Sequence, residues 1–405
     1  MATPSNHDAT FLQELKRQLA THRKWVKQQR GGRPVDFSFM DMSRLTLSGA
    51  VFEKARMIGV CLARSDLTRA NMRATILMMA DLEQADFSHA DLLGSDLRGA
   101  CLNGANLTET NLAGTDFRSG AMGGVGLQSG RGANNTINRR TELIHANLTR
   151  ALMMEAKLEG CDLTGAELVD ADLSGADLSG AILVGTDLSG VTLKNATLTG
   201  AVLSGAVLDE AVLAQMEAAG FDPKSSLEPL GGRILALVES HQRWVTSVGE
   251  DGERLELDKA DLSGANLSGA DLSGCKIQRS NLSGVNLSGA KLVMADLSSC
   301  TLVGANLENA DLSGCLLRRA NLSQAILKGG ILNGVPLGGD VTRPWPTNFQ
   351  YARLVDADLR CQSADRAIFS FADLTGAQIN MALLRTADLN GAKGAKKPGQ
   401  SFTDV

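Results

Sequence analysis

The sequence predicts a solenoid, a rod built by stacking copies of one short repeat. A large apolar residue (Leu, Phe, Met or Ile) recurs at every fifth position over most of the chain, and the residue two positions earlier is nearly always small. A period of five matches neither the turn of an α-helix nor the alternation of a β-strand. An internal repeat of this kind determines the architecture before any local assignment is made.

The composition agrees with a narrow, aliphatic interior. The 405 residues include 43 Gly, one Tyr and only 4% aromatic residues, so Leu and Ala must fill the core. The net charge of −5 argues against generic nucleic-acid binding through a basic surface. The chain has no apolar run as long as a membrane span, and its N-terminus has no signal-peptide pattern. We therefore expect a cytoplasmic protein without a membrane span.

The seven cysteines are scattered without metal-ligand spacing. Four of them occupy the small repeat position, where Ala is usual, and this position is expected to face inward: Cys161, Cys275, Cys300 and Cys315. We interpret them as small core residues in a reducing compartment. The sequence predicts no metal site and no cofactor.

The repeat centres, meaning the large apolar residues, form four arrays. The first runs from Phe37 to Phe117, and the second runs from Leu143 to Leu213, one residue out of phase. The third runs from Leu257 to Leu337 and the fourth from Leu354 to Leu389. Because stacked coils must keep register, the residues between the first two arrays and between the last two must loop outward.

The string Ala-Asn-Leu-Ser-Gly-Ala-Asp-Leu-Ser-Gly, which begins at Ala265, resembles the Ala-(Asp/Asn)-Leu-X-X consensus of the pentapeptide-repeat family. The resemblance extends over about four fifths of the chain. It implies an all-β fold, a right-handed quadrilateral parallel β-helix in which four pentapeptides make one coil. The centre and the small residue then point inward, and the Asp or Asn, Ser or Thr, and Gly lie on or near the surface. Extended faces stacked in this way pair as in a parallel sheet.

Two segments with a helical pattern precede repeat arrays, at residues 10–30 and 233–247. They align closely over His22–Val26 and His241–Val245, and each is followed by a Gly-containing turn and a first array of the same length. We interpret them as capping α-helices that shield an open β-helix end, with a partner-binding helix as the alternative. We expect the paired His and Trp residues to serve packing and capping.

This correspondence predicts two tandem units made by duplication. The first unit is residues 1–222 with an outward loop at about 119–142, a linker covers 223–229, and the second unit is residues 230–405 with an outward loop at about 338–350. The amphipathic segment Asp209–Gly220 is expected to close the first solenoid.

The sequence contains no catalytic constellation. Its five His residues lie far apart, and it has no His-x-x-x-His, no Cys-x-x-Cys and no phosphate-binding loop with a Lys. The repeat is expected to place its carboxylates outward in solvated rows, without a closed pocket or a raised pKa. We therefore predict that the protein is not an enzyme.

The two outward loops are the first candidate sites, because loops on rigid scaffolds often carry function. Arginines and an exposed Trp in these loops could bind acidic or aromatic groups of a partner. The candidates are Arg131, Arg139, Arg140, Arg343 and Trp345, with Phe349 placed in the same loop as the last two.

The second array is the other candidate. Some relatives in the pentapeptide-repeat family inhibit or protect DNA gyrase and resemble duplex DNA in shape and charge. Leu143–Leu213 holds ten acids and three bases, about one net charge per 2.6 Å of axis, against one per 1.7 Å in duplex DNA. The candidate acidic face consists of Asp162, Glu167, Asp170, Asp172, Asp177 and Asp187, which alternatively form an ordinary solvated surface.

The leading hypothesis is a non-enzymatic scaffold that binds an unknown protein partner through faces and loops of the repeats. The alternative is a DNA-mimicking inhibitor of a topoisomerase, and a third possibility is an effector delivered by a secretion system that needs no cleavable signal. Direct nucleic-acid binding is not expected.

Overall fold

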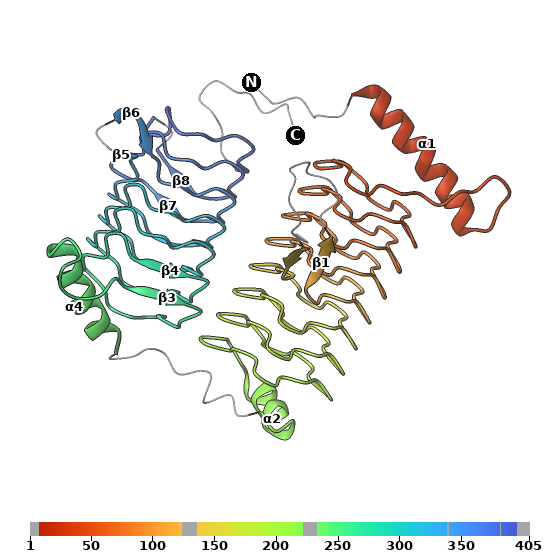
Figure 1. The fold of residues 1–405 in the computed structure, drawn as a ribbon, viewed down its shortest axis with the longest axis horizontal. Coiled ribbons are helices and arrows are strands. Elements are labelled where there is room, and N and C mark those ends of the chain that lie inside the picture. Colours follow the sequence, from red (N-terminus) through yellow and green to blue (C-terminus); the bar gives the residue numbers. More distant parts are fainter. Residues whose placement is uncertain (1–7, 124–135, 222–232, 338–339, 381, 395–405) are drawn as a thin grey trace. The chain divides into compact units, whose positions relative to one another are not determined.

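The computed structural model describes residues 8–123, 136–221, 233–337, 340–380 and 382–394. The chain divides into two units, Met1–Pro223 and Lys224–Val405. Each unit, taken by itself, is a stack of coils; among the described residues, one helix precedes the coils in each unit, and a further short helix follows the coils of the first (Figure 1). Within the described residues, no helix is both long and apolar enough to cross a membrane.

Successive coils pair through parallel β-bridges between residues 20 positions apart, such as Asp36 with Arg56 and Asp261 with Asn281. The repeat period is five, so each coil has four faces. The backbone bonds follow the same spacing: Phe37 N donates to Arg56 O (2.8 Å), and Arg56 N donates to Val35 O (3.2 Å). The predicted β-helix is therefore observed in both units.

The repeat positions have the predicted orientations. Centres such as Leu178 and Leu297 are at most 1% exposed, and the small residues two before them are buried as well. The fifth position turns the corner with a left-handed backbone, at φ +64° in Gly264 and +59° in Arg44. Glycine is the least strained residue there, which explains its frequency in the repeat.

Several hydroxyl and thiol groups at the small inward position are hydrogen-bonded to the preceding coil. Thr75 Oγ1 donates to Phe52 O (2.8 Å) and Cys300 Sγ donates to Ile277 O (3.1 Å). All four cysteines predicted to face inward are fully buried and free of disulfides. Burial raises the pKa of the Cys275 thiol to about 12, so this thiol keeps its proton at neutral pH. Thr75 and Cys300 thus replace Ala without leaving an unsatisfied polar group, whereas the buried hydroxyl of Ser95, at the same repeat position, has no hydrogen-bond partner among the described residues.

Most of the regular elements are short. The helices are α1 (Ala9–Val26), α2 (Glu210–Ala218) and α4 (Arg233–Thr246). Extended coil faces form the parallel pairs β3 (Glu256–Asp258) with β4 (Lys276–Gln278), and β7 (Asp358–Leu359) with β8 (Gln378–Ile379). The antiparallel pairs are β1 (Gly120–Gly123) with β2 (Thr136–Arg139), and β5 (Val335–Leu337) with β6 (Asp340–Trp345).

The helices α1 and α4 join their coils through the same side chain. His22 Nδ1 accepts a hydrogen bond from Val35 N (3.3 Å), and His241 Nδ1 accepts one from Leu255 N (3.0 Å). Each His is fully buried. Each also stacks on the Trp three residues later, with ring centroids 5.4 Å apart in α1 and 5.5 Å apart in α4. The paired His and Trp residues thus have a packing role, as predicted.

The helix α2 supplies side-chain partners for the last coil of the first unit. Leu193 N donates to Gln215 Oε1 (2.8 Å), and Gln215 Nε2 donates to Val191 O (3.2 Å). Gly190 N donates to Asp209 Oδ2 (2.7 Å). These groups take the place of backbone groups that a further coil would provide.

Two array ends differ from the prediction. The second array does not reach Leu213, because the last parallel bridge is at Val207 and Leu213 lies within α2. Asp209 starts that helix by accepting a hydrogen bond from Val212 N (2.8 Å).

The third array ends at Leu332, and Leu337 is 47% exposed in β5. Pro336 stands where a bridge residue would donate its N–H to Cys315 O, and proline has no N–H. Asn348 N makes that bond instead (2.9 Å). The first arrays of the two units are therefore unequal, and that of the second unit is one pentapeptide shorter.

Candidate functional site: two inserted hairpins

Each unit contains one antiparallel hairpin inserted between two stacked coils. The spacing of bridged residues rises from 20 to 41 across the β1–β2 insertion, where Cys101 pairs with Glu142. It rises to 32 across the β5–β6 insertion, where Leu316 pairs with Asn348. The coils before and after each insertion still pair directly, so the hairpins extend from the coil without interrupting the stack.

Both hairpins return to the coil through a fully buried Thr that bonds to the backbone. Gly99 N donates to Thr141 Oγ1 (2.8 Å) in the first unit. Gly314 N donates to Thr347 Oγ1 (3.1 Å) in the second. Each hydroxyl also lies within hydrogen-bonding distance of two carbonyl oxygens, those of Leu97 and Arg118 in the first unit and of Leu312 and Asn333 in the second. The same anchor is thus present twice.

A corner glycine leaves room for each hairpin stem. A Cβ on Gly314 would lie 2.7 Å from Met294 Sδ and 3.0 Å from Val335 Cγ2. Trp345 Cδ1 would be 3.4 Å away. In the first unit a Cβ on Gly99 would lie 2.6 Å from Met79 Sδ and 3.1 Å from Gly120 Cα. The stems therefore pack directly on the coil.

We expect Gly314→Ala to displace the second hairpin. The matched control is Gly304→Ala, because Gly304 has a similar φ (+63° against +66°) but nothing within 4 Å of its Cβ position. Both variants carry the left-handed backbone cost of about 1–2 kcal/mol, but only Gly314→Ala also pushes on the stem. Hydrogen exchange over Val335–Trp345 should accelerate in Gly314→Ala alone. Equal exchange in the two variants would contradict the packing described here.

The hairpins carry exposed apolar side chains. Ile137 on β2 is 58% exposed, and on the second hairpin Leu337 is 47% and Trp345 41% exposed.

Among the predicted loop arginines, Arg139 is half-buried and Arg140 is exposed. Of the other predicted loop residues, Arg131 lies outside the described residues, and Arg343 is on β6 with a side chain that is not among those described.

Phe349 is not a loop residue. It is a fully buried centre of the next coil, and its ring stacks on Phe369 with centroids 4.7 Å apart. The second hairpin spans Val335–Trp345, earlier than the predicted 338–350. The coil has already resumed at Asn348, which bridges Leu316.

The six candidate acidic residues do not share one face. Four of them are five residues apart and therefore occupy the four different faces: Asp162, Glu167, Asp172 and Asp177. Only Glu167 and Asp187 stack directly, as a bridged pair. Asp170 lies at a corner with φ +57°. Asp162 is 2% exposed, although the sequence suggested an outward position.

The Asp residues of the repeat also have a structural role. Asp172 Oδ1 accepts a hydrogen bond from Ser174 N (2.9 Å), and Asp177 Oδ1 accepts one from Ser179 N (2.9 Å). Asn repeats this contact, as in Asn281 with Ser283 N (3.0 Å). The preference for Asp or Asn before each centre is explained by this local bond to the turn.

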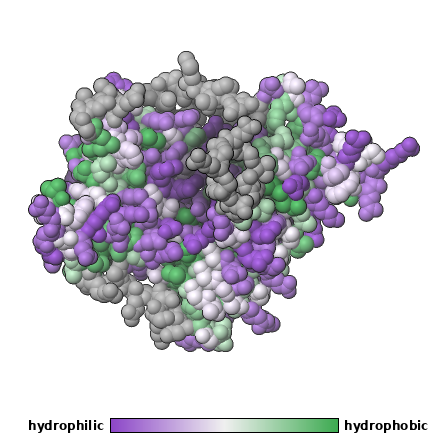
Figure 2. Space-filling model, in the orientation of Figure 1, coloured by the Kyte–Doolittle hydropathy of each residue, from purple (hydrophilic) through white to green (hydrophobic). Residues whose placement is uncertain are grey.

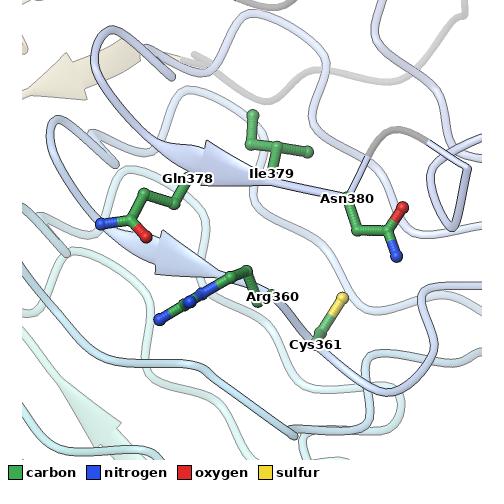
Figure 3. Close-up of a pocket in the computed structure, with 5 residues that line it drawn as sticks. All are labelled: Arg360, Cys361, Gln378, Ile379 and Asn380. Atoms are coloured by element: carbon green, nitrogen blue, oxygen red, sulfur yellow. The ribbon is translucent and has the colours of Figure 1, made fainter.

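A shallow hollow of about 460 Å³ lies at the last coils of the second unit. Figure 3 shows the five residues that line it, Arg360, Cys361, Gln378, Ile379 and Asn380. The Arg360 guanidinium is paired with Asp358 (Nε to Oδ1, 2.8 Å), and burial raises the pKa of the Cys361 thiol. The described residues contain no group of three His, Cys, Asp or Glu side chains that could hold a metal ion. Nothing in these residues indicates catalysis.

The comparisons with known proteins agree with the observed repeat. A family model described as Pentapeptide repeats (8 copies) matches residues 35–119, 139–216, 256–292, 295–334 and 352–391, which is more than half of the chain. No curated protein matches the sequence.

Several solved structures are similar. HetL, a pentapeptide repeat protein involved in heterocyst differentiation regulation in the cyanobacterium Nostoc sp. strain PCC 7120, is 21% identical over 92% of this chain and 94% of its own, with a TM-score of 0.26. QnrB1, a plasmid-mediated fluoroquinolone resistance protein, is 21% identical over 46% of this chain and 98% of its own, with a TM-score of 0.26. Rfr23 from the cyanobacterium Cyanothece 51142 is 31% identical over 32% of this chain and 64% of its own, with a TM-score of 0.12. On the family match and the five-residue β-helix repeat, the chain belongs to the pentapeptide-repeat family.

Proposed function

We propose that the protein is a non-enzymatic scaffold that binds a protein partner through its two hairpins. The single observation that carries this proposal is the repeated anchor. Thr141 and Thr347 bond to equivalent backbone groups, although the two insertions differ in length. These buried contacts hold each insertion on its coil, so each hairpin is presented on a fixed stem.

The exposed side chains on the hairpins suit binding. Trp345 and Leu337 lie on one hairpin and Ile137 on the other, each more than two fifths exposed. A Trp held on a rigid stem is a typical centre of a protein–protein interface, because it buries a large area at a small cost in conformational entropy. The partner is expected to present an apolar pocket.

We further propose that the two units arose by duplication of one module, residues 1–222 and 230–405, in which α1 and α4 cap the coils. The equivalent His and Thr contacts support this origin. The capping helices would prevent the first coil from pairing edge to edge with another chain. DNA mimicry has less support, because the acidic candidates are distributed over four faces and Asp162 is buried.

The proposal is tested by affinity capture from the native cell with the intact protein and two variants. Trp345→Ser combined with Leu337→Ser should weaken partner binding by about 30-fold or more, the usual effect of removing an interface centre. Ile326→Ser is the matched control, because Ile326 is 40% exposed on the coil of the same unit. Equal binding by both variants and the wild type would refute a docking role for this hairpin.

A further inference from the structure

The two N-terminal helices make the same contacts but differ in charge. Residues 16–33 contain seven Lys or Arg and no Asp or Glu. The equivalent residues 235–252 contain one Arg and three acids. His241 of α4 bonds to the coil and stacks on Trp244 of the same helix, although α4 lacks these cations. The cations of α1 are therefore not needed for the junction with the coil.

The cations of α1 are exposed and mostly unpaired. Arg17 forms an ion pair with Glu14 (2.6 Å). Six others are exposed and form no ion pair with any described residue; we call them the α1 basic surface: Lys16, Arg23, Lys24, Lys27, Arg30 and Arg33. The hydrophilic atoms that project from the region of α1 are visible at the right edge of the molecule (Figure 2).

The geometry of the helix places three of these charges in one row beside the buried side of the helix. Lys16, Arg23 and Lys27 follow one another at seven- and four-residue spacing and so share one side of the helix. Leu15 and His22, about 100–120° around the helix from this row, are at most 5% exposed. At 1.5 Å per residue, the row from Lys16 to Lys27 is about 16 Å long.

The helix dipole explains only part of this pattern. Cations in the last turn of a helix are favourable because they neutralise the partial negative charge of the terminal carbonyls. Arg23 and Lys24 lie in that turn of α1, whereas α4 has only Arg243 there. Lys16 lies in the middle of the helix, and Arg30 and Arg33 follow its end, so the dipole does not account for them.

We propose that the α1 basic surface binds the phosphate backbone of a nucleic acid. Arg makes up half of the surface, and its planar guanidinium bonds two phosphate oxygens at once. Duplex DNA carries one negative charge per about 1.7 Å, so a row of this length faces several phosphates. The net charge of the whole chain, −5, does not reveal this basic surface, because residues 143–213 contribute ten acids against three bases.

An anionic membrane is the weaker alternative. A helix that inserts into a membrane interface needs a free apolar side. The apolar side of α1 packs on the coil at Leu15 and His22, and no α1 side chain is among the large apolar residues that are exposed. The surface shares no residue with the hairpins, and its test does not depend on the proposed partner binding.

The test uses the intact protein and a fluorescent mixed-sequence DNA duplex, titrated at several salt concentrations. Wild type should bind at low salt, with affinity falling steeply as salt rises. The triple variant Arg23→Gln, Lys24→Gln, Lys27→Gln should bind at least about tenfold more weakly and lose about 0.9 from the log–log salt slope for each phosphate contact removed. The control is Arg243→Gln, which neutralises the equivalent of Lys24 on α4 and should leave binding unchanged.

Melting curves of all three proteins establish that the variants are folded. Absence of wild-type binding at low salt would overturn the proposal. It would also be overturned if the triple variant bound as well as wild type, or if polyglutamate or vesicles of anionic lipid bound better than the duplex. The hairpin variants Trp345→Ser and Leu337→Ser should bind DNA like wild type, which separates this surface from the hairpin site.

Discussion

Leu178→Asp is expected to unfold the first unit. Leu178 is 1% exposed, and its column of centres includes Leu158 and Leu198 of the neighbouring coils. The substitution removes a buried Leu, worth about 1.5–3 kcal/mol, and places a carboxylate in an apolar stack with no partner. The combined loss is expected to exceed about 4 kcal/mol, a large part of the 5–15 kcal/mol that stabilises a typical domain.

The matched control is Ser179→Asp, one residue further along on the outside of the same face. Ser179 is half-buried and turns away from the core, so the same charge there should cost about 0.5 kcal/mol or less. Urea unfolding followed by circular dichroism compares the two. Equal midpoints would contradict the inward assignment of the centres.

The Leu178 variant also tests whether coils support one another only locally. In a solenoid each coil contacts its neighbours alone, so stability is close to a sum over adjacent pairs. The second unit has its own core, from Ile234 to Leu389. We expect the melting transition of the second unit to persist in Leu178→Asp while that of the first unit is lost.

The β-helix could be predicted because each pentapeptide repeats the same information. The inward orientation of the centres follows from dozens of in-phase matches, so one irregular unit does not alter the conclusion. The ends of the arrays are different, because each end occurs once. Ala211-Val212-Leu213 fits the repeat as well as Ala206-Val207-Leu208, yet Asp209 starts a helix between them. Period alone does not say whether a neighbouring coil exists.

Two of the wrong predictions, the end of the third array at Leu337 and the single acidic face, could have been avoided from the sequence. Pro336 occupies a position whose N–H must bond to the preceding coil, which excludes Leu337 as a centre. The acids at 162, 167, 172 and 177 are one pentapeptide apart, so a four-sided coil must place them on four faces. In both cases the repeat itself contained the information.

The junction contacts could not be predicted. Val35 N donates to His22, 13 residues earlier in the chain, and Gly99 N donates to Thr141, 42 residues later. These bonds depend on how the chain turns between helix and coil, and between hairpin and coil, where no period applies. A polar residue in such a junction has many possible partners, and only the folded structure selects one.

We expect the His contacts to make the stability of both units sensitive to mild acid. Nδ1 of His22 and of His241 accepts a backbone N–H, so protonation of that nitrogen breaks the bond. Burial is the largest cause that lowers the pKa of both rings. Nearby groups act more weakly: Glu53 raises the pKa of His22, while Asp271 raises and Arg254 lowers that of His241.

The sign of the effect follows from these lowered values. Above the unfolded-state pKa of about 6.5, both His side chains are neutral in the folded and in the unfolded chain, and the stability that their contacts contribute is fully present. As pH falls below about 6.5 the unfolded chain binds protons first, so stability decreases until the folded pKa is reached. Each unit of pKa difference corresponds to about 1.4 kcal/mol per His. The carboxylates whose pKa is lowered, such as Asp209 and Asp271, contribute their full stability at neutral pH and lose it only as pH falls below their unfolded-state pKa of about 4.

We therefore expect urea midpoints of the wild type to fall between about pH 7 and pH 5.5, above the range in which carboxylates titrate. The double variant His22→Asn, His241→Asn keeps a side-chain acceptor but has no group that titrates at these positions. It should be less stable than wild type at neutral pH, because the ring packing on Trp25 and Trp244 is lost, yet its midpoint should be nearly constant over this window. A single substitution, His22→Asn, should remove the dependence from the transition of the first unit alone. If the double variant keeps the pH slope of the wild type, the slope arises elsewhere, and the neutral His acceptors are not what joins these helices to their coils.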